Sequence, residues 1–315
     1  MPQASVNIGA ESMKAFIGIT DKNWFELLQS QPQLEEVNFW QPSGSRQFRA
    51  LQPGALFLFK LHSPNNYIVG GGIFAHATRL PISLAWESFG IANGAWNLSQ
   101  MRSRVARYRR QTEDRRADYT IGCILLEQPF FLERQAWIPV PYDWKPNIVQ
   151  GRTYDLTQEP GLSLWHQVQS ALSVSHRMHE GIPQYGEPHL VRPRLGQGTF
   201  RVVVTDAYER RCAVTQEKVL PALDAAHIRP FSEGGEHCIT NGLLLRSDVH
   251  RLFDRGYVTV TPEKYFEVSN KIHEDFHNGR EYYALHGKRI HIPQKSDLHP
   301  EIGYLAWHNE HIFKG

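Results

Sequence analysis

Apolar residues in the first half of the chain form continuous runs that are separated by turn residues. Three such runs cover residues 53–61, 67–78 and 119–132. The first begins with Pro-Gly, and the sequence His-Ser-Pro-Asn-Asn separates it from the second. Runs of this kind, bounded by turn signals, are typical of strands that are buried on both faces. The pattern therefore predicts a curled β-sheet with a few short helices in this part of the chain.

Helical spacing of apolar residues marks four other segments. Residues 21–29, with Asp21 as N-cap, and residues 81–90 are predicted to be short helices. Residues 161–175 are amphipathic at the helical period. Residues 199–214 are also predicted to be helical despite their consecutive valines. Their apolar side chains recur at helical spacing, at Phe200, Val203, Val204, Ala207 and Tyr208.

Length and composition favour two folded domains. A chain of 315 residues with 41% hydrophobic residues has enough apolar side chains to fill two cores. We expect an N-terminal β-rich domain at 1–150, a linker with an amphipathic helix at 151–195, and a C-terminal domain at 196–315. Pro and Gly are frequent at 181–198, which predicts extended chain there. The expected fold class is α+β.

Polar residues that suit phosphodiester hydrolysis are concentrated in one short stretch of the C-terminal domain. His227 lies on a predicted apolar strand, and Asn241 opens a second strand after a Gly-rich turn. His250 precedes Asp254 by four positions, which places both side chains on one face of a helix. A neutral imidazole can take a proton from water near pH 7. The arrangement suits one divalent cation and one activated water.

This stretch, from "LDAAHIRP" to "NGLLLRSDVHRLFDRG", closely resembles the HNH motif, the ββα-metal finger of many DNA endonucleases. The resemblance implies that His227 is the general base and that Asn241 braces the loop and orients the base. It also implies that His250 is a metal ligand of the catalytic site. The ion implied is a single Mg²⁺ or Mn²⁺ per active site.

The remaining metal ligands are less clearly defined by the motif. Asp254 is expected to be a further ligand beside His250. The family places a ligand just before the base histidine, where this chain has Ala226. Asp224 is the nearest acidic residue that can replace it, so we expect the metal site to be Asp224, His250 and Asp254.

Each of these residues also has an ordinary structural interpretation. A single strand histidine is more often a core residue than a catalyst, and an Asp four residues after a helical His is often a surface pair. Taken singly, Asp224 and Asp254 favour that interpretation. The order His, Asn, His at the intervals of the motif favours the nuclease.

The cysteines and the chain terminus exclude some classes of protein. Cys123, Cys212 and Cys238 are the only cysteines, so one chain cannot form the four-cysteine zinc site of many HNH domains. Cys212, Cys238 and His237 are a conceivable metal set, but small buried residues are the favoured interpretation. So few cysteines also argue against a disulfide-stapled secreted protein. No signal segment or membrane-spanning run is present in the sequence, and we expect a soluble cytoplasmic protein.

Basic residues are unevenly distributed, although the formal net charge is only +2. A cluster of arginines precedes the third apolar run, and guanidinium groups are well suited to contact phosphates. The alternative is a solvated helix face. We expect DNA phosphate contacts from Arg102, Arg104, Arg107, Arg109 and Arg110, with Arg115 and Arg116 in the same cluster.

The N-terminal phrase "QPGALFLFKLHSPNNYIVGGGIFAHATRLPISLAWESFG" resembles the PUA-like group, which includes EVE and SRA-type domains. The resemblance implies that this domain is a curled β-barrel with short helices. Such domains flip a modified base out of the duplex and hold it in an aromatic pocket. Most aromatics in a region of this size pack in the core. Glycines 70–72 indicate a bulge or a close approach of the backbone. The candidates for the pocket are Trp40, the first choice, then Trp86, Tyr67 and Trp96, with Trp24 and Phe89 also considered.

Together with "LGQGTFR", a phrase similar to one in bacterial restriction-type HNH proteins, these resemblances imply a modification-dependent restriction endonuclease. Its partner would be double-stranded DNA that carries modified cytosine, and a homodimer would allow both strands to be cut. Two alternatives stay open. The N-terminal domain of an HNH nuclease or nickase could bind unmodified DNA, RNA or protein. The chain could also be a non-catalytic DNA-binding protein with a degenerate HNH scaffold.

Overall fold

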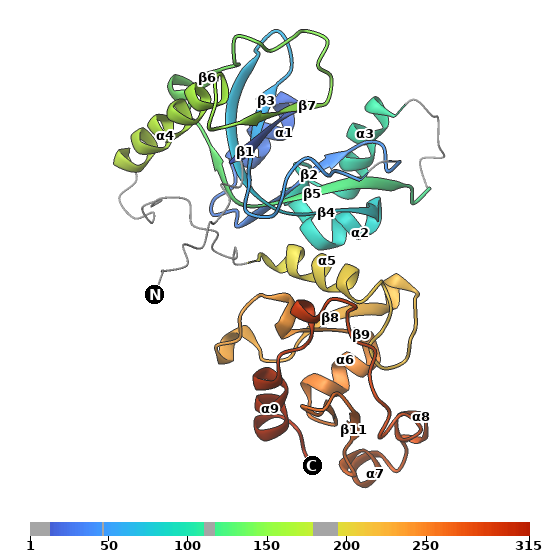
Figure 1. Ribbon diagram of the computed structural model, residues 1–315. Helices are drawn as coiled ribbons and strands as arrows, with labels where there is room; N and C mark the ends of the chain where they lie inside the picture. Colours follow the sequence, from blue (N-terminus) through green and yellow to red (C-terminus); the bar gives the residue numbers. More distant parts are fainter. Residues whose placement is uncertain (1–12, 46, 110–116, 179–194) are drawn as a thin grey trace, which may run out of the picture. The chain divides into compact units, whose positions relative to one another are not determined.

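The computed structural model describes residues 13–45, 47–109, 117–178 and 195–315 (Figure 1). The chain divides into two compact units, Met1–Pro193 and Arg194–Gly315. Both contain helices and strands, which confirms the predicted α+β class. None of the helices in the described ranges combines the length and apolarity that a membrane span requires.

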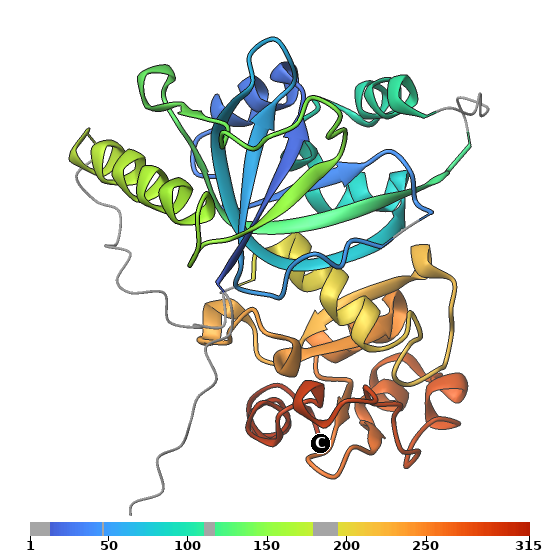
Figure 2. The same cartoon turned by 45° about the horizontal axis from the view of Figure 1, so that its top comes forward.

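The first unit is built on a sheet in the order β2-β5-β4-β3-β1-β7, with β6 beside β4. Only β1 and β3 are parallel neighbours, and the other pairs are antiparallel. The long strands β4 and β5 bend as they cross the sheet (Figure 2). In the described residues no pairing joins β2 to β7, so the strands form an open path. The strands are β1 (Lys14–Thr20), β2 (Glu36–Gln41), β3 (Leu56–Leu61), β4 (Tyr67–Pro81), β5 (Thr120–Phe131), β6 (Ile138–Pro139) and β7 (Gly151–Asp155).

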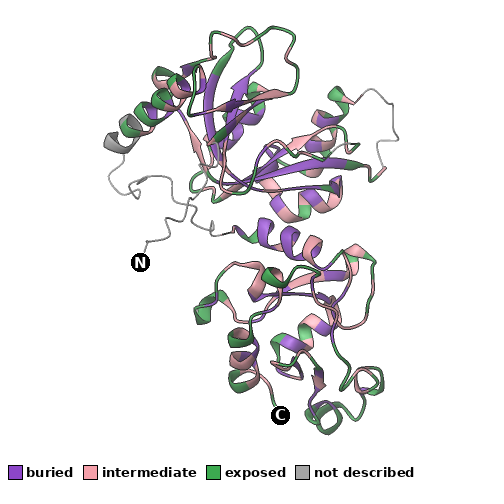
Figure 3. Cartoon of the chain, in the orientation of Figure 1, coloured by how far each residue is buried: buried purple, intermediate pink, exposed green. Residues whose placement is uncertain are grey.

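Both faces of this sheet are covered, as the continuous apolar runs predicted (Figure 3). Along β3, Phe57 and Phe59 join the core cluster that contains Trp24 of α1 (Lys22–Gln29). Leu58, between them, joins a second cluster with Leu164 of α4 (Gly161–Met178). Successive side chains of a strand face opposite ways, so one apolar run supplies two cores.

The glycines of β4 allow the close approach that the sequence indicated. A Cβ on Gly70 would collide with the carbonyl oxygen of Phe130, and one on Gly71 with that of Phe57. The register of β4 against β5 also shifts between Gly71 and Ile73, which is a bulge. Bulges bend a strand and increase its twist, so they contribute to the curl of the sheet.

Three α-helices of the first unit precede β5 in the chain. The predicted N-cap is confirmed, because Asp21 Oδ1 accepts a hydrogen bond of 2.8 Å from the N–H of Trp24 in α1. α2 (Ile82–Phe89) matches the expected helix at 81–90 and leads through a 3-10 turn, η1 (Gly90–Asn93), to α3 (Leu98–Tyr108).

The segment expected to be a linker belongs partly to the first unit. β7 pairs with β1, and Val168 of α4 is fully buried against the sheet. The predicted amphipathic helix of that segment agrees with α4. The strand β7 was not predicted, because its sequence Gly-Arg-Thr-Tyr-Asp has no apolar run. The expected extended chain at 181–198 lies largely outside the described residues.

The second unit contains the ββα arrangement expected of the motif. β8 (Leu223–His227) and β9 (Gly242–Arg246) form an antiparallel pair, and α6 (Ser247–Asp254) follows directly. α5 (Gln197–Ala207), predicted from its apolar spacing, contributes Phe200 and Val204 to the same core. The other elements are β10 (Val258–Val260), β11 (Phe266–Val268), α7 (Lys271–Phe276), α8 (Arg280–Tyr283) and α9 (Ile302–His311).

Candidate active site

The ββα unit brings the motif residues of the second unit onto one short scaffold. Asp224 lies opposite Leu245, and His227 lies opposite Gly242, across the β8–β9 pair. Val249 and Phe253 of α6 are buried in the core, so the helix is fixed beside the strands. This packing holds the polar side chains of α6 beside those of β8.

His227 is partly buried and held on two sides. Its ring stacks on Phe200 of α5, with ring centroids 3.8 Å apart and planes 10° from parallel. Its Nε2 lies 3.2 Å from Nδ1 of His237. Burial, and then the imidazoles of His237 and His250, lower the pKa of His227 to about 4. The ring is therefore neutral near pH 7, which is the state that can accept a proton.

Asn241 braces the loop between β8 and β9 from inside the protein. The side chain is fully buried. Its Oδ1 accepts from the N–H of Arg229, and its Nδ2 donates to the carbonyl oxygens of Arg229 and Glu236, each at 2.9 Å. A Cβ on Gly235 would collide with the Arg229 carbonyl oxygen, so the tight loop requires glycine there. Asn241 thus holds the segment that carries His237.

The three expected metal ligands are brought together. His250 Nδ1 lies 3.8 Å from Asp224 Oδ2, and His250 Nε2 lies 3.3 Å from Asp254 Oδ2. Arg201 of α5 reaches the other side of Asp224, with Nη2 3.9 Å from Oδ1. The imidazole therefore stands between two carboxylates.

The donor atoms of this set suit a hard divalent cation, for which carboxylate oxygens are preferred ligands. Burial, and then the Asp224 carboxylate, raise the pKa of Asp254, whereas His250 lowers it. A cation would relieve that repulsion between carboxylates. Within the described ranges, no three or more His, Cys, Asp or Glu side chains already converge as a metal-binding group. Here the imidazole separates the two carboxylates, so binding an ion requires the ring or a carboxylate to move.

Cys212 and Cys238 contact nearby polar groups of the protein through their sulfur atoms. Cys212 is buried, and its Sγ accepts hydrogen bonds from the N–H groups of Thr215 and Arg246. Cys238 Sγ lies 3.4 Å from Thr240 Oγ1. From the sequence, His237 was considered only as a partner of these cysteines, and its contact with His227 was not predicted. The available signal was a histidine on the Gly-rich loop that follows the base.

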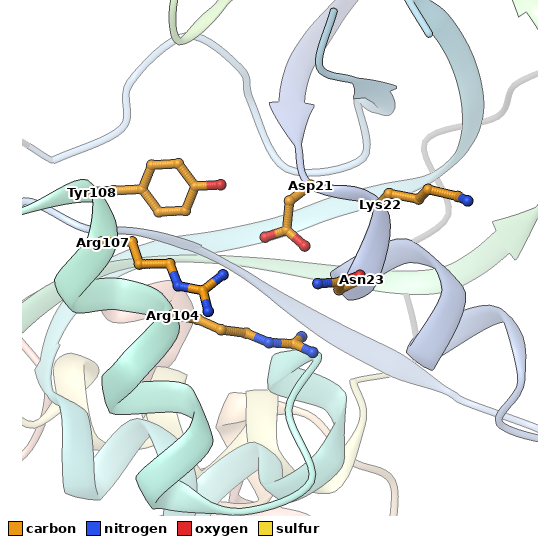
Figure 4. Close-up of a pocket in the computed structure, with 6 residues that line it drawn as sticks. All are labelled: Asp21, Lys22, Asn23, Arg104, Arg107 and Tyr108. Carbon is orange, nitrogen blue, oxygen red and sulfur yellow. The ribbon is translucent and has the colours of Figure 1, made fainter. Parts of the chain in front are cut away.

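The first unit contains a separate pocket of about 120 Å³ between α1 and α3. Figure 4 shows the Asp21 carboxylate and the Arg107 guanidinium facing each other across it, beside the Tyr108 ring. Burial, and then the Asp21 carboxylate, raise the pKa of Tyr108. The lining residues are Asp21, Lys22, Asn23, Arg104, Arg107 and Tyr108.

Two further aromatic rings lie near Tyr108. The His62 ring is parallel to Tyr108 within 5°, at a centroid distance of 6.2 Å. Trp40 lies 6.3 Å from Tyr108 and donates from Nε1 to the carbonyl oxygen of Asn93 at 2.9 Å. Of the candidates for the aromatic pocket, Trp40 thus lies near this pocket, although it does not line it. Tyr108 and Asp21, which do line it, were not among the candidates named from the sequence.

The other aromatic candidates lie elsewhere in the first unit. Tyr67, at the start of β4, packs 6.0 Å from Trp137. Trp86 is half-buried on α2, and Trp96 is 61% exposed just before α3. Trp24 and Phe89 are core residues.

The arginines of α3 have several different surroundings. Arg104 and Arg107 line the pocket, and Arg104 also donates to the Gly94 carbonyl oxygen. Arg109 donates to the carbonyl oxygens of Pro42 and Thr120 and lies over the Tyr119 ring. Arg102 lies 3.9 Å from Asp118. Arg110, Arg115 and Arg116 lie outside the described residues.

Comparison with known proteins agrees with the ββα geometry. Residues 212–261 match the HNH endonuclease family described as HNH_2. No curated relative matches the chain. Among solved structures, ASCH from Zymomonas mobilis is 11% identical with a TM-score of 0.33, over 51% of this chain and 94% of that one. A modification-dependent restriction endonuclease, TagI, is 12% identical with a TM-score of 0.28, over 95% of this chain and 82% of that one. On the family match, the chain carries an HNH endonuclease domain.

Proposed function

We propose that this protein is a modification-dependent DNA endonuclease. The HNH domain would hydrolyse the phosphodiester bond, and the first unit would select DNA with a modified cytosine. The observation that carries the nuclease assignment is a neutral imidazole, His227, held on the same ββα scaffold as the set Asp224, His250 and Asp254. TagI, to which the chain is similar, is a modification-dependent restriction endonuclease.

The chemistry assigned to the chain is proton transfer and positioning. His227 takes a proton from a water molecule, and the resulting hydroxide attacks the phosphorus atom. The bond from phosphorus to the leaving oxygen then breaks, and the leaving oxygen takes a proton from solvent water. Asn241 keeps the loop in place while this happens. Asp224, His250 and Asp254 would hold Mg²⁺ or Mn²⁺, which when bound supplies charge neutralisation at the phosphate. Cutting both strands would require two HNH domains, so we propose that two copies act on one site.

The pocket between α1 and α3 is the proposed base site. Tyr108 offers an aromatic face for stacking, and the second oxygen of Asp21 can accept from the exocyclic amine of cytosine. Asn23 offers an amide that can donate to the remaining edge of the base. The aromatic face, the carboxylate and the amide together can recognise a base, and Lys22, Arg104 and Arg107, which also line the pocket, can contact the flanking phosphates.

Binding in EDTA tests the base site without cleavage. The full chain should bind a short duplex with one 5-methylcytosine or 5-hydroxymethylcytosine more tightly than the matched plain duplex. Stacking contributes roughly 1–3 kcal/mol per base, so Tyr108→Ala should remove most of this preference, whereas Tyr108→Phe should retain most of it. Trp96→Ala and Trp86→Ala, outside the pocket, are matched controls. Equal affinity of the unaltered protein for all three duplexes would contradict the base-sensor proposal.

A further inference from the structure

One ring nitrogen of His227, the proposed general base, contacts a second histidine. His227 Nε2 lies 3.2 Å from His237 Nδ1, and the two rings meet edge to face at 89° with centroids 4.8 Å apart. His237 comes from the loop after β8, outside the His-Asn-His order of the motif. An imidazole is thus placed where it fixes which nitrogen of His227 carries a proton.

Both rings are held in place by their neighbours. His227 stacks on Phe200, and His237 meets the same phenylalanine nearly at right angles, 6.0 Å away. On its other side His237 packs 5.1 Å from Phe231. The backbone of the preceding residue is held in place, because Asn241 Nδ2 donates to the Glu236 carbonyl oxygen. Asn241 therefore acts on His227 through the position of His237.

Proton counting limits the arrangements of this pair. A neutral imidazole has one N–H donor and one nitrogen lone pair, so in a hydrogen bond between two such rings one ring donates and the other accepts. If His237 Nδ1–H donates, His227 carries its own proton on Nδ1 and has no lone pair left for a water proton. If His227 Nε2–H donates, its Nδ1 lone pair is available. Only the second arrangement makes His227 a base.

We propose that His237 is a positioning residue, whose Nδ1 accepts from His227 Nε2–H and so directs the lone pair on His227 Nδ1 toward the attacking water. This inference rests on the proposed function, because it concerns the base of the same reaction. When His227 takes the water proton on Nδ1, its positive charge is shared with the Nε2–H donor, and the His237 lone pair stabilises it. A neutral acceptor does this without placing a fixed negative charge beside the DNA phosphate.

Substitution of His237 in the full-length protein tests the role in turnover. His237→Leu removes the acceptor, and we expect kcat with Mg²⁺ to fall by at least roughly tenfold, because the wrong tautomer of a base is costly, while KM for DNA stays within about threefold. His237→Asn places an amide oxygen near the position of Nδ1 and should recover a large part of kcat. His277→Asn is the matched control, because His277 is an exposed residue at the C-cap of α7 and asparagine tolerates its φ of 54°. Equal kcat for His237→Leu and the unaltered protein would overturn the proposal.

The tautomer can be measured without any cleavage. Long-range ¹H–¹⁵N correlation spectra of the full chain with ¹⁵N-labelled histidine, assigned by comparison with His227→Gln, should show His227 protonated on Nε2 at pH 7. Protonation on Nδ1 would overturn the proposal even if every variant folded poorly. A protein that cuts no DNA but shows the Nε2–H tautomer would contradict the proposed function, whereas a protein that cuts DNA but shows the Nδ1–H tautomer would overturn the positioning inference alone.

Discussion

The two candidate sites of this protein are assembled over very different distances along the chain. The nuclease residues lie between Asp224 and Asp254, on two paired strands and the helix that follows. The pocket of the first unit instead joins Asp21, before α1, to Tyr108, at the end of α3. A site made within one supersecondary unit has fixed spacing in the sequence, whereas one made by folding distant segments together has none.

The two regions also differ in how rigidly their side chains are held. His227 is stacked and hydrogen-bonded, and Asn241 is fully buried with every polar group of its amide used. Tyr108 is 46% exposed, and the Lys22 ammonium pairs with Glu26 on the surface. Catalysis needs groups that are already oriented, whereas a site that receives a flipped base can close around it. The predictions below separate these two kinds of site.

The largest effect is expected from His227→Ala. Loss of a general base typically costs on the order of 10²–10⁴-fold in rate, and DNA binding should be unchanged because it depends on other residues. Single-turnover cleavage and binding in EDTA measure the two quantities separately. His311→Ala, an exposed histidine on α9, is the control. Cleavage within a few-fold of the unaltered protein would remove His227 from the mechanism.

Carboxylate removal should change the metal requirement. Asp224→Asn and Asp254→Asn each take one oxygen ligand from the pair around His250, so the Mg²⁺ concentration for half-maximal cleavage should rise by at least roughly tenfold. Asp297→Asn, on an exposed 3-10 turn, should leave it unchanged. Titration of Mg²⁺ against the cleavage rate of each variant measures this concentration. An unchanged value for Asp224→Asn would assign the ion to the side chains of α6 alone.

Acid should unfold the nuclease domain in a defined window. Burial lowers the pKa of both His227 and His308 to about 4, below the ordinary value of 6.5. The unfolded chain therefore binds protons first, so stability is fully present above pH 6.5 and declines as pH falls toward 4. The loss is about 2 to 3 kcal/mol per histidine. Hydrogen exchange across this range should show that the amides of the β8–α6 region lose protection at a higher pH in the unaltered protein than in His308→Gln. Equal protection factors at pH 7 and pH 4.5 in the unaltered protein would contradict the account.

The smallest effects are expected from the arginines of α3. If Arg107 contacts phosphate, Arg107→Gln should weaken binding to modified and plain DNA alike and reduce the slope of log affinity against log salt by about 0.9. Arg109→Gln should instead lower the melting temperature, because the carbonyl oxygens of Pro42 and Thr120 lose a donor. A loss confined to modified DNA in Arg107→Gln would place this side chain in base recognition.

The sequence was sufficient where a physical rule acts locally. The Asp21 cap, the α5 helix and the ββα motif were predicted because capping, apolar period and ligand spacing are short-range signals. β7 was missed because a polar strand can pair with β1 without an apolar run. The role of His237 was missed because its contact with His227 depends on the bend that Gly235 and Asn241 impose.

The pocket that we propose as the base site could not be predicted from the aromatic residues alone. Trp40 was favoured for its polar surroundings, yet its indole N–H donates to the Asn93 carbonyl oxygen, and its ring does not line the pocket. The lining of the pocket depends on how α3 packs against the start of α1. Such tertiary packing leaves no periodic signature in the chain.

Cleavage of matched plasmids tests the central claim most directly. One plasmid preparation is treated to carry 5-methylcytosine, a second carries 5-hydroxymethylcytosine, and a third is plain. Each is incubated with the full-length protein and Mg²⁺ or Mn²⁺, or with EDTA. We predict metal-dependent cutting of at least one modified plasmid, no cutting of the plain plasmid, and no cutting by His227→Ala. Equal cutting of all three would contradict the selection of modified DNA, and absence of cutting in every reaction would contradict the nuclease itself.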